Sequence, residues 1–264
     1  MKRLIVAALV IPPIILYITR LSVHWYAGML IAAATLAQYE FYSMYNLDRR
    51  LKLASLFFGV LIILSYYLSG GGYLPEVMII SFIFISALRL FGKKDPSSSL
   101  RDIAPAVVGL FYIPLLLSLQ MGLRKQGPEW IVLLYGAVWS ADGLAYFIGK
   151  YFGKRKLYES VSPKKTVEGA FASVLGGAIG ALILWRPLSM QTPLSITLLA
   201  GAFIGLAAIL GDLVESMFKR DAGIKDSGGF LPGGHGGMLD KLDAALFAGP
   251  ALYWFMSAIG IIRS

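Results

Sequence analysis

The chain has 264 residues, of which 57% are hydrophobic and only 15% are charged. Soluble domains carry about 25% charged residues, so this composition excludes an ordinary soluble domain and favours a membrane protein. The absence of cysteine excludes disulfide frameworks and thiolate metal sites. The net charge of +9 comes from short loops between apolar runs. Lysine and arginine in such loops report orientation and contact with anionic lipid, so nucleic acid is not the expected partner.

Long apolar runs follow one another along the chain and predict an all-α, polytopic integral membrane protein. The runs are continuously apolar and lack the alternation of a transmembrane β-barrel. The first run follows a basic start but has no small-residue cleavage site, so we interpret it as a retained span and not as a signal peptide. About nine segments are long enough to cross a bilayer as helices: 4–20, 23–44, 52–69, 74–91, 103–122, 130–149, 167–186, 193–218 and 240–262.

The distribution of lysine and arginine predicts the orientation. With the N-terminus in the cytoplasm, the cytoplasmic side receives 18 of the 24 basic residues, the opposite side receives 5, and Arg89 falls inside a span. This asymmetry follows the positive-inside rule. We therefore expect a multi-pass protein of the cell's inner (cytoplasmic) membrane, with the polar loop after Met217 facing the cytoplasm.

The two halves of the chain differ in their polar content. Residues 1–128 are apolar with ordinary loops, and we expect them to form a scaffold that offers lipid or dimer contacts. Glu40 lies near a span in this half, and the sequence names no partner for it. Residues 129–264 are expected to hold the catalytic cytoplasmic loops. Six carboxylates there lie within or at the ends of apolar helices, where an unpaired charge is costly: Asp142, Glu168, Asp212, Glu215, Asp240 and Asp243.

An anion site is predicted in residues 160–169, which read SVSPKKTVEG. Thr166 can cap a helix that begins near Val167. Lys164 and Lys165 stand directly before that cap. Free backbone N–H groups and the helix dipole both favour phosphate at a helix N-terminus, so the lysines and the cap together predict phosphate binding.

The densest polar cluster lies near the C-terminus and reads GDLVESMFKRDAGIKDSGGFLPGGHGGMLDKLD. Asp212 lies three residues before Glu215 and four before Ser216, so these side chains can share one helix face. Asp240 and Asp243 repeat the spacing of three at the start of the last apolar segment. Carboxylates from two facing helices can hold Mg²⁺, a cation that prefers oxygen ligands.

Basic residues and glycines stand between the two acidic pairs. The glycines allow backbone N–H groups to approach a ligand closely. Carboxylate-held metal, basic side chains and a glycine-rich loop are together typical of phosphoryl and nucleotidyl transfer. The residues concerned are Lys219, Arg220, Lys225, His235, Gly228, Gly229, Gly233, Gly234, Gly236 and Gly237.

Simpler explanations compete for single residues. Lys219 and Arg220 taken alone are typical of interfacial anchors, and Asp212 with Lys219 could be a helix-end pair. The GxxxG pairs Gly176–Gly180 and Gly201–Gly205 are more typical of helix packing than of a site. There is no nucleophile elbow for a serine hydrolase. With two distant histidines and no cysteine, there is no zinc signature either.

A long motif in residues 216–243 reads SMFKRDAGIKDSGGFLPGGHGGMLDKLD. It is preceded by GDL at 211–213, by SPKKT at 162–166 and by ADGLAY at 141–146. Together these segments resemble the phosphatidate cytidylyltransferases (CDP-diacylglycerol synthases). Their signature is S-x-x-K-R, four residues, K-D and then P-G-H-G-G-x-x-D-R-x-D, accompanied by G-D-L, S-P-x-K-T and A-D-x-x-A-Y elements.

Two positions depart from that signature. Gly233 and Gly234 both precede His235, where the family has one glycine. Lys241 stands where arginine is usual, which keeps the charge but loses the bidentate fork. The match covers about residues 139–243, and the first half adds only hydropathy.

The resemblance implies an enzyme that transfers the cytidylyl group of CTP to phosphatidate, giving CDP-diacylglycerol and pyrophosphate for phospholipid synthesis. It implies Mg²⁺, leaves a second cation open and favours a homodimer. The implied metal ligands are Asp212, Asp240 and Asp243. The implied catalytic residues are Asp212, Lys219, Arg220, Lys225, Asp226, His235, Asp240 and Asp243. The implied substrate-binding residues are Asp142, Ser162, Lys164, Lys165, Thr166, Glu168, Ser216, Gly236, Gly237 and Lys241.

Two other functions remain open. A CTP-dependent polyprenol or phytol kinase would share the nucleotide chemistry but pass the γ-phosphoryl group to an alcohol, releasing CDP instead of pyrophosphate. A membrane transporter would also place acids at helix ends. It predicts an inverted repeat and polar residues near the midplane in both halves, and the first half shows neither. A CDP-alcohol phosphotransferase would need a D-G-x-x-A-R run, which this sequence lacks.

Overall fold

The computed structural model describes residue 20 and residues 22–228 and 236–261. The regular secondary structure of these residues is helical apart from one two-stranded hairpin, so the predicted all-α fold is confirmed. Helices α5, η1 and α6 join end to end, and the described residues therefore form eight separate helical rods. The elements are α2 (Val23–Met44), α3 (Arg49–Ser69), α4 (Leu74–Lys93), α5 (Ser99–Leu110), η1 (Phe111–Leu115), α6 (Leu116–Gln126), α7 (Pro128–Phe152), β1 (Lys156–Tyr158), β2 (Ser162–Thr166), α8 (Val167–Trp185), α9 (Leu194–Asp221) and α10 (Leu239–Ala258).

Six of the rods in the described part of the chain are long and apolar enough to cross a membrane. The protein is therefore a polytopic membrane protein, but the prediction of nine spans is wrong. Helices α2 and α10 form where spans were predicted, yet neither is among the six. Gln38 and Glu40 interrupt the apolar run of α2, and three charged residues open α10. The first predicted span, 4–20, lies outside the described residues except for Arg20.

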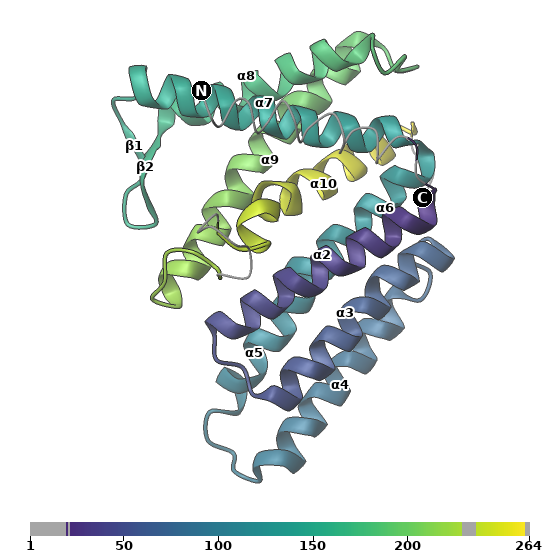
Figure 1. Ribbon diagram of the computed structural model, residues 1–264, viewed down its shortest axis with the longest axis vertical. Helices are drawn as coiled ribbons and strands as arrows, with labels where there is room; N and C mark the ends of the chain where they lie inside the picture. The colour runs from purple at the N-terminus through teal and green to yellow at the C-terminus, as the bar shows by residue number, and fades with distance from the viewer. Residues whose placement is uncertain (1–19, 21, 229–235, 262–264) are drawn as a thin grey trace.

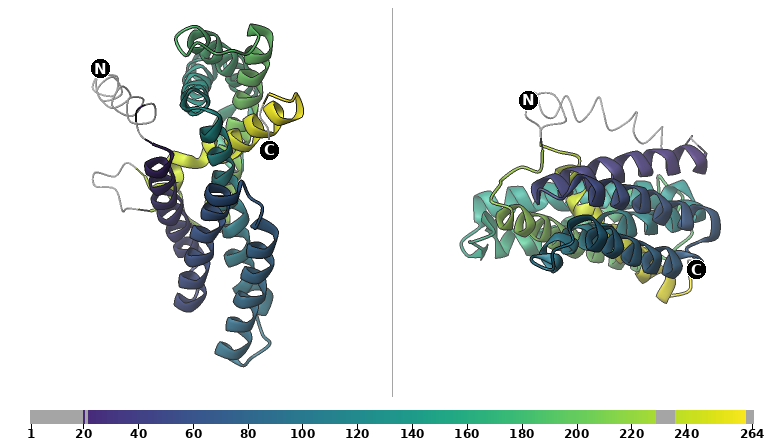
Figure 2. Two further views of the ribbon diagram at one scale, coloured as in Figure 1. Left: turned by 90° about the vertical axis from the view of Figure 1, so that its right-hand side faces the viewer. Right: turned by 90° about the horizontal axis from the view of Figure 1, so that it is seen from below.

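The rods form two groups that α10 joins (Figure 1). Helices α7, α8 and α9 pack against one another in the first group, and α2, α3, α4 and the α5–α6 rod pack together in the second. Helix α10 packs against α9 and α7 on one side and against α6 and α2 on the other. Figure 2 shows it crossing between the two groups. The acidic start of α10 therefore lies where both groups can reach it.

Glycines let α7, α8 and α9 approach closely. Gly176–Gly180 faces α7 and Gly201–Gly205 faces α8. A Cβ atom at Gly176 would lie 2.7 Å from a carbonyl oxygen of α7, which no side chain tolerates. Ser173 in α8 donates through Oγ to the carbonyl oxygen of Gly205 at 2.8 Å. The packing interpretation of both GxxxG pairs is confirmed.

Arg89, the basic residue predicted inside a span, is only 5% exposed. Its Nε lies 2.6 Å from Oδ2 of Asp102, at the start of the next rod. Its other nitrogens donate to the carbonyl oxygens of Asp95 at 2.9 Å and Ser97 at 2.7 Å. A buried guanidinium needs such partners, and these bonds hold the loop after α4 against the helix.

Candidate active site

The lysine-bearing segment folds as a hairpin that ends in the predicted helix cap. Strands β1 and β2 pair antiparallel, and Thr166 is the N-cap of α8, with Oγ1 accepting a hydrogen bond from the backbone N of Gly169 at 3.1 Å. This confirms the predicted cap. Glu168 accepts hydrogen bonds from the backbone N of Lys154 at 3.0 Å and of Arg155 at 3.3 Å. In this structure Glu168 therefore anchors the start of the hairpin.

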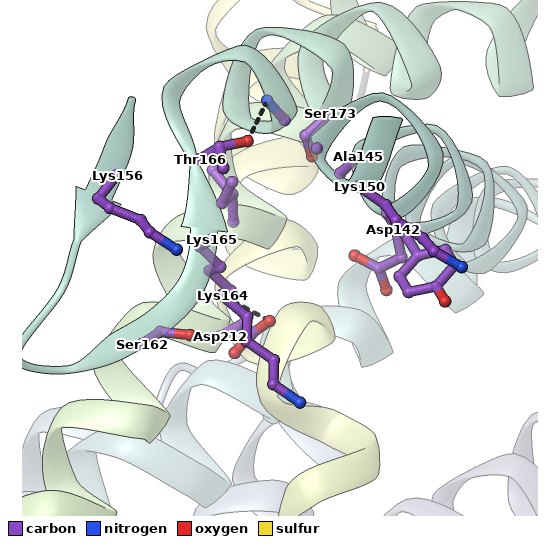
Figure 3. Close-up of a pocket in the computed structure, with 14 residues that line it drawn as sticks. Asp142, Ala145, Lys150, Lys156, Ser162, Lys164, Lys165, Thr166, Ser173 and Asp212 are labelled. Atoms are coloured by element: carbon purple, nitrogen blue, oxygen red, sulfur yellow. Dashed lines mark hydrogen bonds and ion pairs between the residues drawn. The ribbon is translucent and has the colours of Figure 1, made fainter. Parts of the chain in front are cut away.

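A cavity of about 690 Å³ lies between this hairpin and helices α7, α8 and α9 (Figure 3). Its volume is in the usual range for small-ligand sites. The wall combines a helix N-terminus, several lysines and two carboxylates, a composition that suits a phosphorylated ligand. The polar side chains of the wall are Asp142, Tyr146, Lys150, Lys156, Ser162, Lys164, Lys165, Thr166, Ser173 and Asp212.

Lys165 connects the hairpin to α9. Its Nζ lies 2.6 Å from Oδ2 of Asp212, and Oδ1 of the same carboxylate accepts a hydrogen bond from Oγ of Ser216 at 3.3 Å. The predicted shared face of Asp212 and Ser216 is present. Asp142 lines the same cavity from α7. The segments predicted to bind phosphate and metal thus meet at one ion pair.

Three carboxylates gather where α9 crosses α10. Asp212 and Glu215 of α9 and Asp243 of α10 place one oxygen atom each within 4.8 Å of one another. Gly211 permits this crossing, because a Cβ atom there would collide with the carbonyl oxygen of Asp243 and lie 3.2 Å from Cβ of Phe247. Oxygen donors from facing helices are the ligands that a hard divalent cation prefers.

The surroundings of Glu215 fit such a cation. This residue is 1% exposed, and neither of its carboxylate oxygens accepts a hydrogen bond from the described residues. The Nζ of Lys219 lies 2.5 Å from Oε2, and Oε1 has no hydrogen-bond partner within the described ranges of the chain. An unsatisfied buried oxygen is costly, and a bound cation would satisfy it. The sequence singled out Glu215 as a buried acid but did not place it among the metal ligands.

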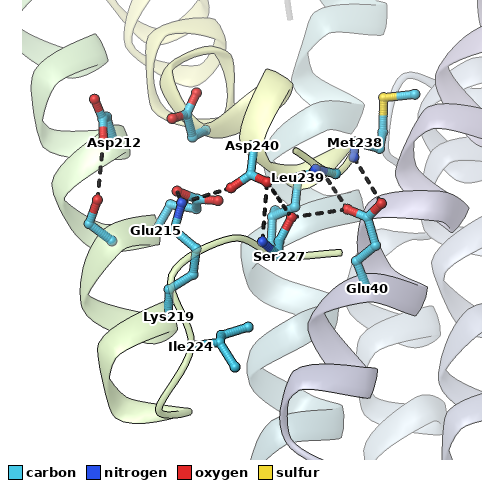
Figure 4. Close-up of polar contacts among 12 residues, drawn as sticks. Glu40, Asp212, Glu215, Lys219, Ile224, Ser227, Met238, Leu239 and Asp240 are labelled. Atoms are coloured by element: carbon cyan, nitrogen blue, oxygen red, sulfur yellow. Dashed lines mark hydrogen bonds and ion pairs between the residues drawn. The ribbon is translucent and has the colours of Figure 1, made fainter. Parts of the chain in front are cut away.

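Asp240 lies beside this cluster, and other groups occupy both of its oxygens (Figure 4). Oδ1 accepts a hydrogen bond from Nζ of Lys219 at 2.7 Å. Oδ2 accepts from N and Oγ of Ser227, at 3.1 and 3.0 Å, and from the backbone N of Gly237 at 2.7 Å. Lys219, which is 9% exposed, therefore links Asp240 to Glu215. The role of Asp240 as a direct metal ligand stays a prediction.

The remaining predicted residues occupy different positions. Arg220 donates from Nε to the carbonyl oxygen of Val161 at 3.3 Å and from a terminal nitrogen to that of Ile224 at 2.9 Å, so it ties the hairpin tip to the loop after α9. Gly236 adopts a φ of 75° that favours glycine. His235 lies outside the described residues, as do Gly233 and Gly234. Exposed side chains with no hydrogen bond or ion pair among the described residues are those of Lys164, Lys225, Asp226 and Lys241.

Glu40 of α2 is a site residue whose partners the sequence did not reveal. It is 5% exposed, and its carboxylate accepts hydrogen bonds from the backbone N of Met238 at 2.9 Å and of Leu239 at 2.8 Å, at the start of α10. A second contact fixes the same end of α2: the hydroxyl of Tyr45 donates to Oδ2 of Asp221 at 3.0 Å. Burial and that carboxylate raise the pKa of Tyr45, so the hydroxyl stays protonated. The only available sequence signal for Glu40 was a carboxylate in an apolar helix.

The fold and this site define a polytopic membrane protein whose acidic helix ends meet a lysine-bearing hairpin. The model described as "Cytidylyltransferase family" matches residues 1–259. The chain belongs to the cytidylyltransferase family. The resemblance that the motifs indicated is therefore confirmed, and it extends to the first half of the chain.

Several curated relatives carry the name phosphatidate cytidylyltransferase. The protein from Thermotoga maritima is 32% identical in an alignment 275 positions long, which covers 99% of this chain and 98% of that protein. The protein from Bacillus subtilis is 42% identical over 135 residues, about half of each chain. The protein from Synechocystis is 45% identical over 129 residues, which cover 47% of this chain and 42% of that protein.

Proposed function

We propose that this chain is a phosphatidate cytidylyltransferase, which transfers the cytidylyl group of CTP to phosphatidate and releases pyrophosphate. The observation that carries the proposal is the ion pair between Lys165 and Asp212, because it joins the lysine-lined cavity to the carboxylate cluster. One site thus offers lysine side chains that can bind phosphate groups and carboxylate oxygens that can bind a divalent metal ion. The similarity to the Thermotoga maritima protein over almost the whole of both chains supports the same reaction.

The chemistry places modest demands on acid–base groups. The phosphomonoester of phosphatidate has a second pKa of about 6, so it is largely a dianion near neutral pH and needs no strong base. One of its oxygens attacks the α-phosphorus of CTP and forms a new P–O bond. The bond from the α-phosphorus to the bridging oxygen breaks, and its electron pair leaves with pyrophosphate. The protein must align two anions and reduce the repulsion between them.

The residues of the site can divide these tasks. Lys164 and Lys165 hold phosphate groups at the N-terminus of α8. Asp212, Glu215 and Asp243 hold Mg²⁺, which when bound neutralises charge on the phosphates and on the leaving pyrophosphate. The roles of the other predicted residues remain part of this proposal: Asp142, Ser162, Thr166, Glu168, Ser216, Lys219, Arg220, Lys225, Asp226, His235, Gly236, Gly237, Asp240 and Lys241.

We also propose that this centre faces the cytoplasm and that the protein acts as a homodimer in the inner membrane. The asymmetry of lysine and arginine supports the orientation, and family resemblance supports the dimer. CTP then reaches the cavity from the aqueous side. Phosphatidate enters laterally between helices, because its acyl chains remain in the bilayer.

The reaction is testable with CTP that carries its label in the α-phosphate. We expect the purified protein in detergent, given phosphatidate and Mg²⁺, to move label into the lipid phase and to release pyrophosphate in equal amount. Omitting phosphatidate or chelating the metal should abolish both products. If the label stays in the aqueous phase and CDP accumulates when a polyprenol or phytol is supplied, the protein is the kinase and the proposal is wrong.

A further inference from the structure

Among the described residues of the first half of the chain, Glu40 is a charged side chain that lies in the interior of the site. Glu40 lies on α2, and its carboxylate contacts the segment that leads into α10, nearly 200 residues later in the sequence. A buried carboxylate is stable only when donors surround it. Glu40 has three: the backbone N–H groups of Met238 and Leu239, and Oγ of Ser227 at 3.3 Å.

These donors belong to the segments on both sides of the glycine-rich loop. Met238 is the N-cap of α10 and Leu239 is its first residue, at the end where the helix dipole also favours an anion. Ser227 precedes the loop and binds Asp240 as well as Glu40. Figure 4 shows the resulting chain of contacts from Glu40 through Ser227 to Asp240 and on to Lys219 and Glu215.

Gly228 and Gly237 both pack closely against Glu40. A Cβ atom at Gly237 would collide with Oε2 of Glu40 and with Oγ of Ser227. A Cβ atom at Gly228 would lie 3.2 Å from Cγ of Glu40. Backbone from both sides of the loop therefore packs against one side chain of α2, at positions where any residue larger than glycine must shift its neighbours.

We propose that Glu40 is a positioning residue: it fixes the start of α10 and Ser227, and thereby holds Asp240 and Lys219 in place beside the carboxylate cluster. The expected effect of Glu40 on kcat rests on the proposed function. Its expected effect on the position of the start of α10 does not. Helix α2 suits the task because Phe41 and Tyr42 are fully buried beside Glu40 and hold its backbone in place. The scaffold half of the chain thus takes part in the site.

The test compares Glu40→Gln and Ser227→Ala with Thr197→Val. Glutamine keeps the shape of the side chain but can accept only one of the two backbone N–H bonds. Thr197 is an equally buried polar residue whose Oγ1 pairs with that of Thr192 at 2.7 Å, away from the site. For Glu40→Gln we expect kcat to fall about 10- to 100-fold, with KM for CTP little changed. The reason is that the alignment of Asp240 and Lys219 with the carboxylate cluster should stabilise the transition state more than it stabilises bound CTP. Ser227→Ala should lower kcat in the same direction, and Thr197→Val should keep wild-type kinetics.

Hydrogen exchange gives a readout that does not depend on activity. In Glu40→Gln the amides of Met238 and Leu239 should exchange faster than in wild type, while those of α8 keep their rates; in Thr197→Val the start of α10 should be unaffected. Unchanged exchange at Met238 and Leu239 would overturn the positioning role. The role would also be overturned if Thr197→Val lost as much kcat as Glu40→Gln. That result would show that kcat falls because the protein is less stable. If wild type transfers no label from CTP to lipid, the proposed function fails, and the exchange rates alone decide on Glu40.

Discussion

Replacing Asp212 by asparagine is expected to reduce cytidylyl transfer about 100-fold or more, because it removes charge from the cation site and from the hairpin contact at once. Asp212 belongs to the carboxylate cluster and also pairs with Lys165 at 2.6 Å. Asparagine has nearly the same shape, so the helix should keep its packing. The measurement is the initial rate of label transfer from CTP to phosphatidate over a range of Mg²⁺ concentrations. The apparent Mg²⁺ requirement should rise together with the loss of rate.

Asp221→Asn is the matched control for this substitution. Asp221 lies on the same helix and accepts a hydrogen bond from Tyr45, but it is outside the cluster. We expect its Mg²⁺ dependence to equal that of wild type. The proposed cation site would be contradicted if Asp212→Asn retained the wild-type rate and Mg²⁺ dependence, or if both variants lost activity to the same extent.

Replacing Lys219 by methionine is expected to lower the free energy of unfolding by about 3–5 kcal/mol, because it leaves buried carboxylates without their cation. Nζ of Lys219 contacts Glu215 at 2.5 Å and Asp240 at 2.7 Å, and all three side chains are largely buried. Methionine fills a similar volume without the charge. Thermal and denaturant unfolding in detergent measure the stability, and label transfer should fall as well because Asp240 loses its partner.

An exposed ion pair provides the control for Lys219. Nζ of Lys93 lies 3.0 Å from Oδ2 of Asp102, but its side chain is 52% exposed. Exposed pairs contribute at most about 1 kcal/mol, so Lys93→Met should change stability little. A second variant, Lys219→Met with Glu215→Gln, should recover part of the lost stability but not the activity. If Lys219→Met and Lys93→Met lowered the free energy of unfolding equally, burial of the charges would not determine how much the Lys219 ion pairs stabilise the protein.

Local features of the fold and site were predictable because their causes are local. Thr166 has a capping side chain directly before an apolar run, and the cap forms where the residues indicate it. The GxxxG pairs bring α7, α8 and α9 together because a glycine every fourth residue leaves one helix face open to a neighbouring backbone. The spacing of Asp212 and Ser216 predicts their shared face for the same reason.

Contacts between distant segments were not predictable. The partners of Glu40 are almost 200 residues away, and no local spacing indicates them. Spacing also could not decide which of Glu215 and Asp240 keeps a carboxylate oxygen without a hydrogen bond or ion pair among the described residues, since this depends on the position of Lys219 between α9 and α10. Counting apolar runs gave nine spans because it did not account for the polar residues within α2 and at the start of α10.

The most direct test of the account is the binding of Mn²⁺, as a spectroscopic substitute for Mg²⁺, in the presence of CTP. Electron paramagnetic resonance titration separates bound from free Mn²⁺ without turnover. We predict that wild type and Asp221→Asn bind Mn²⁺ in a CTP-dependent manner and that Asp212→Asn and Asp243→Asn lose this binding. Equal Mn²⁺ binding by all four proteins would contradict the claim that the ends of α9 and α10 form the cation site.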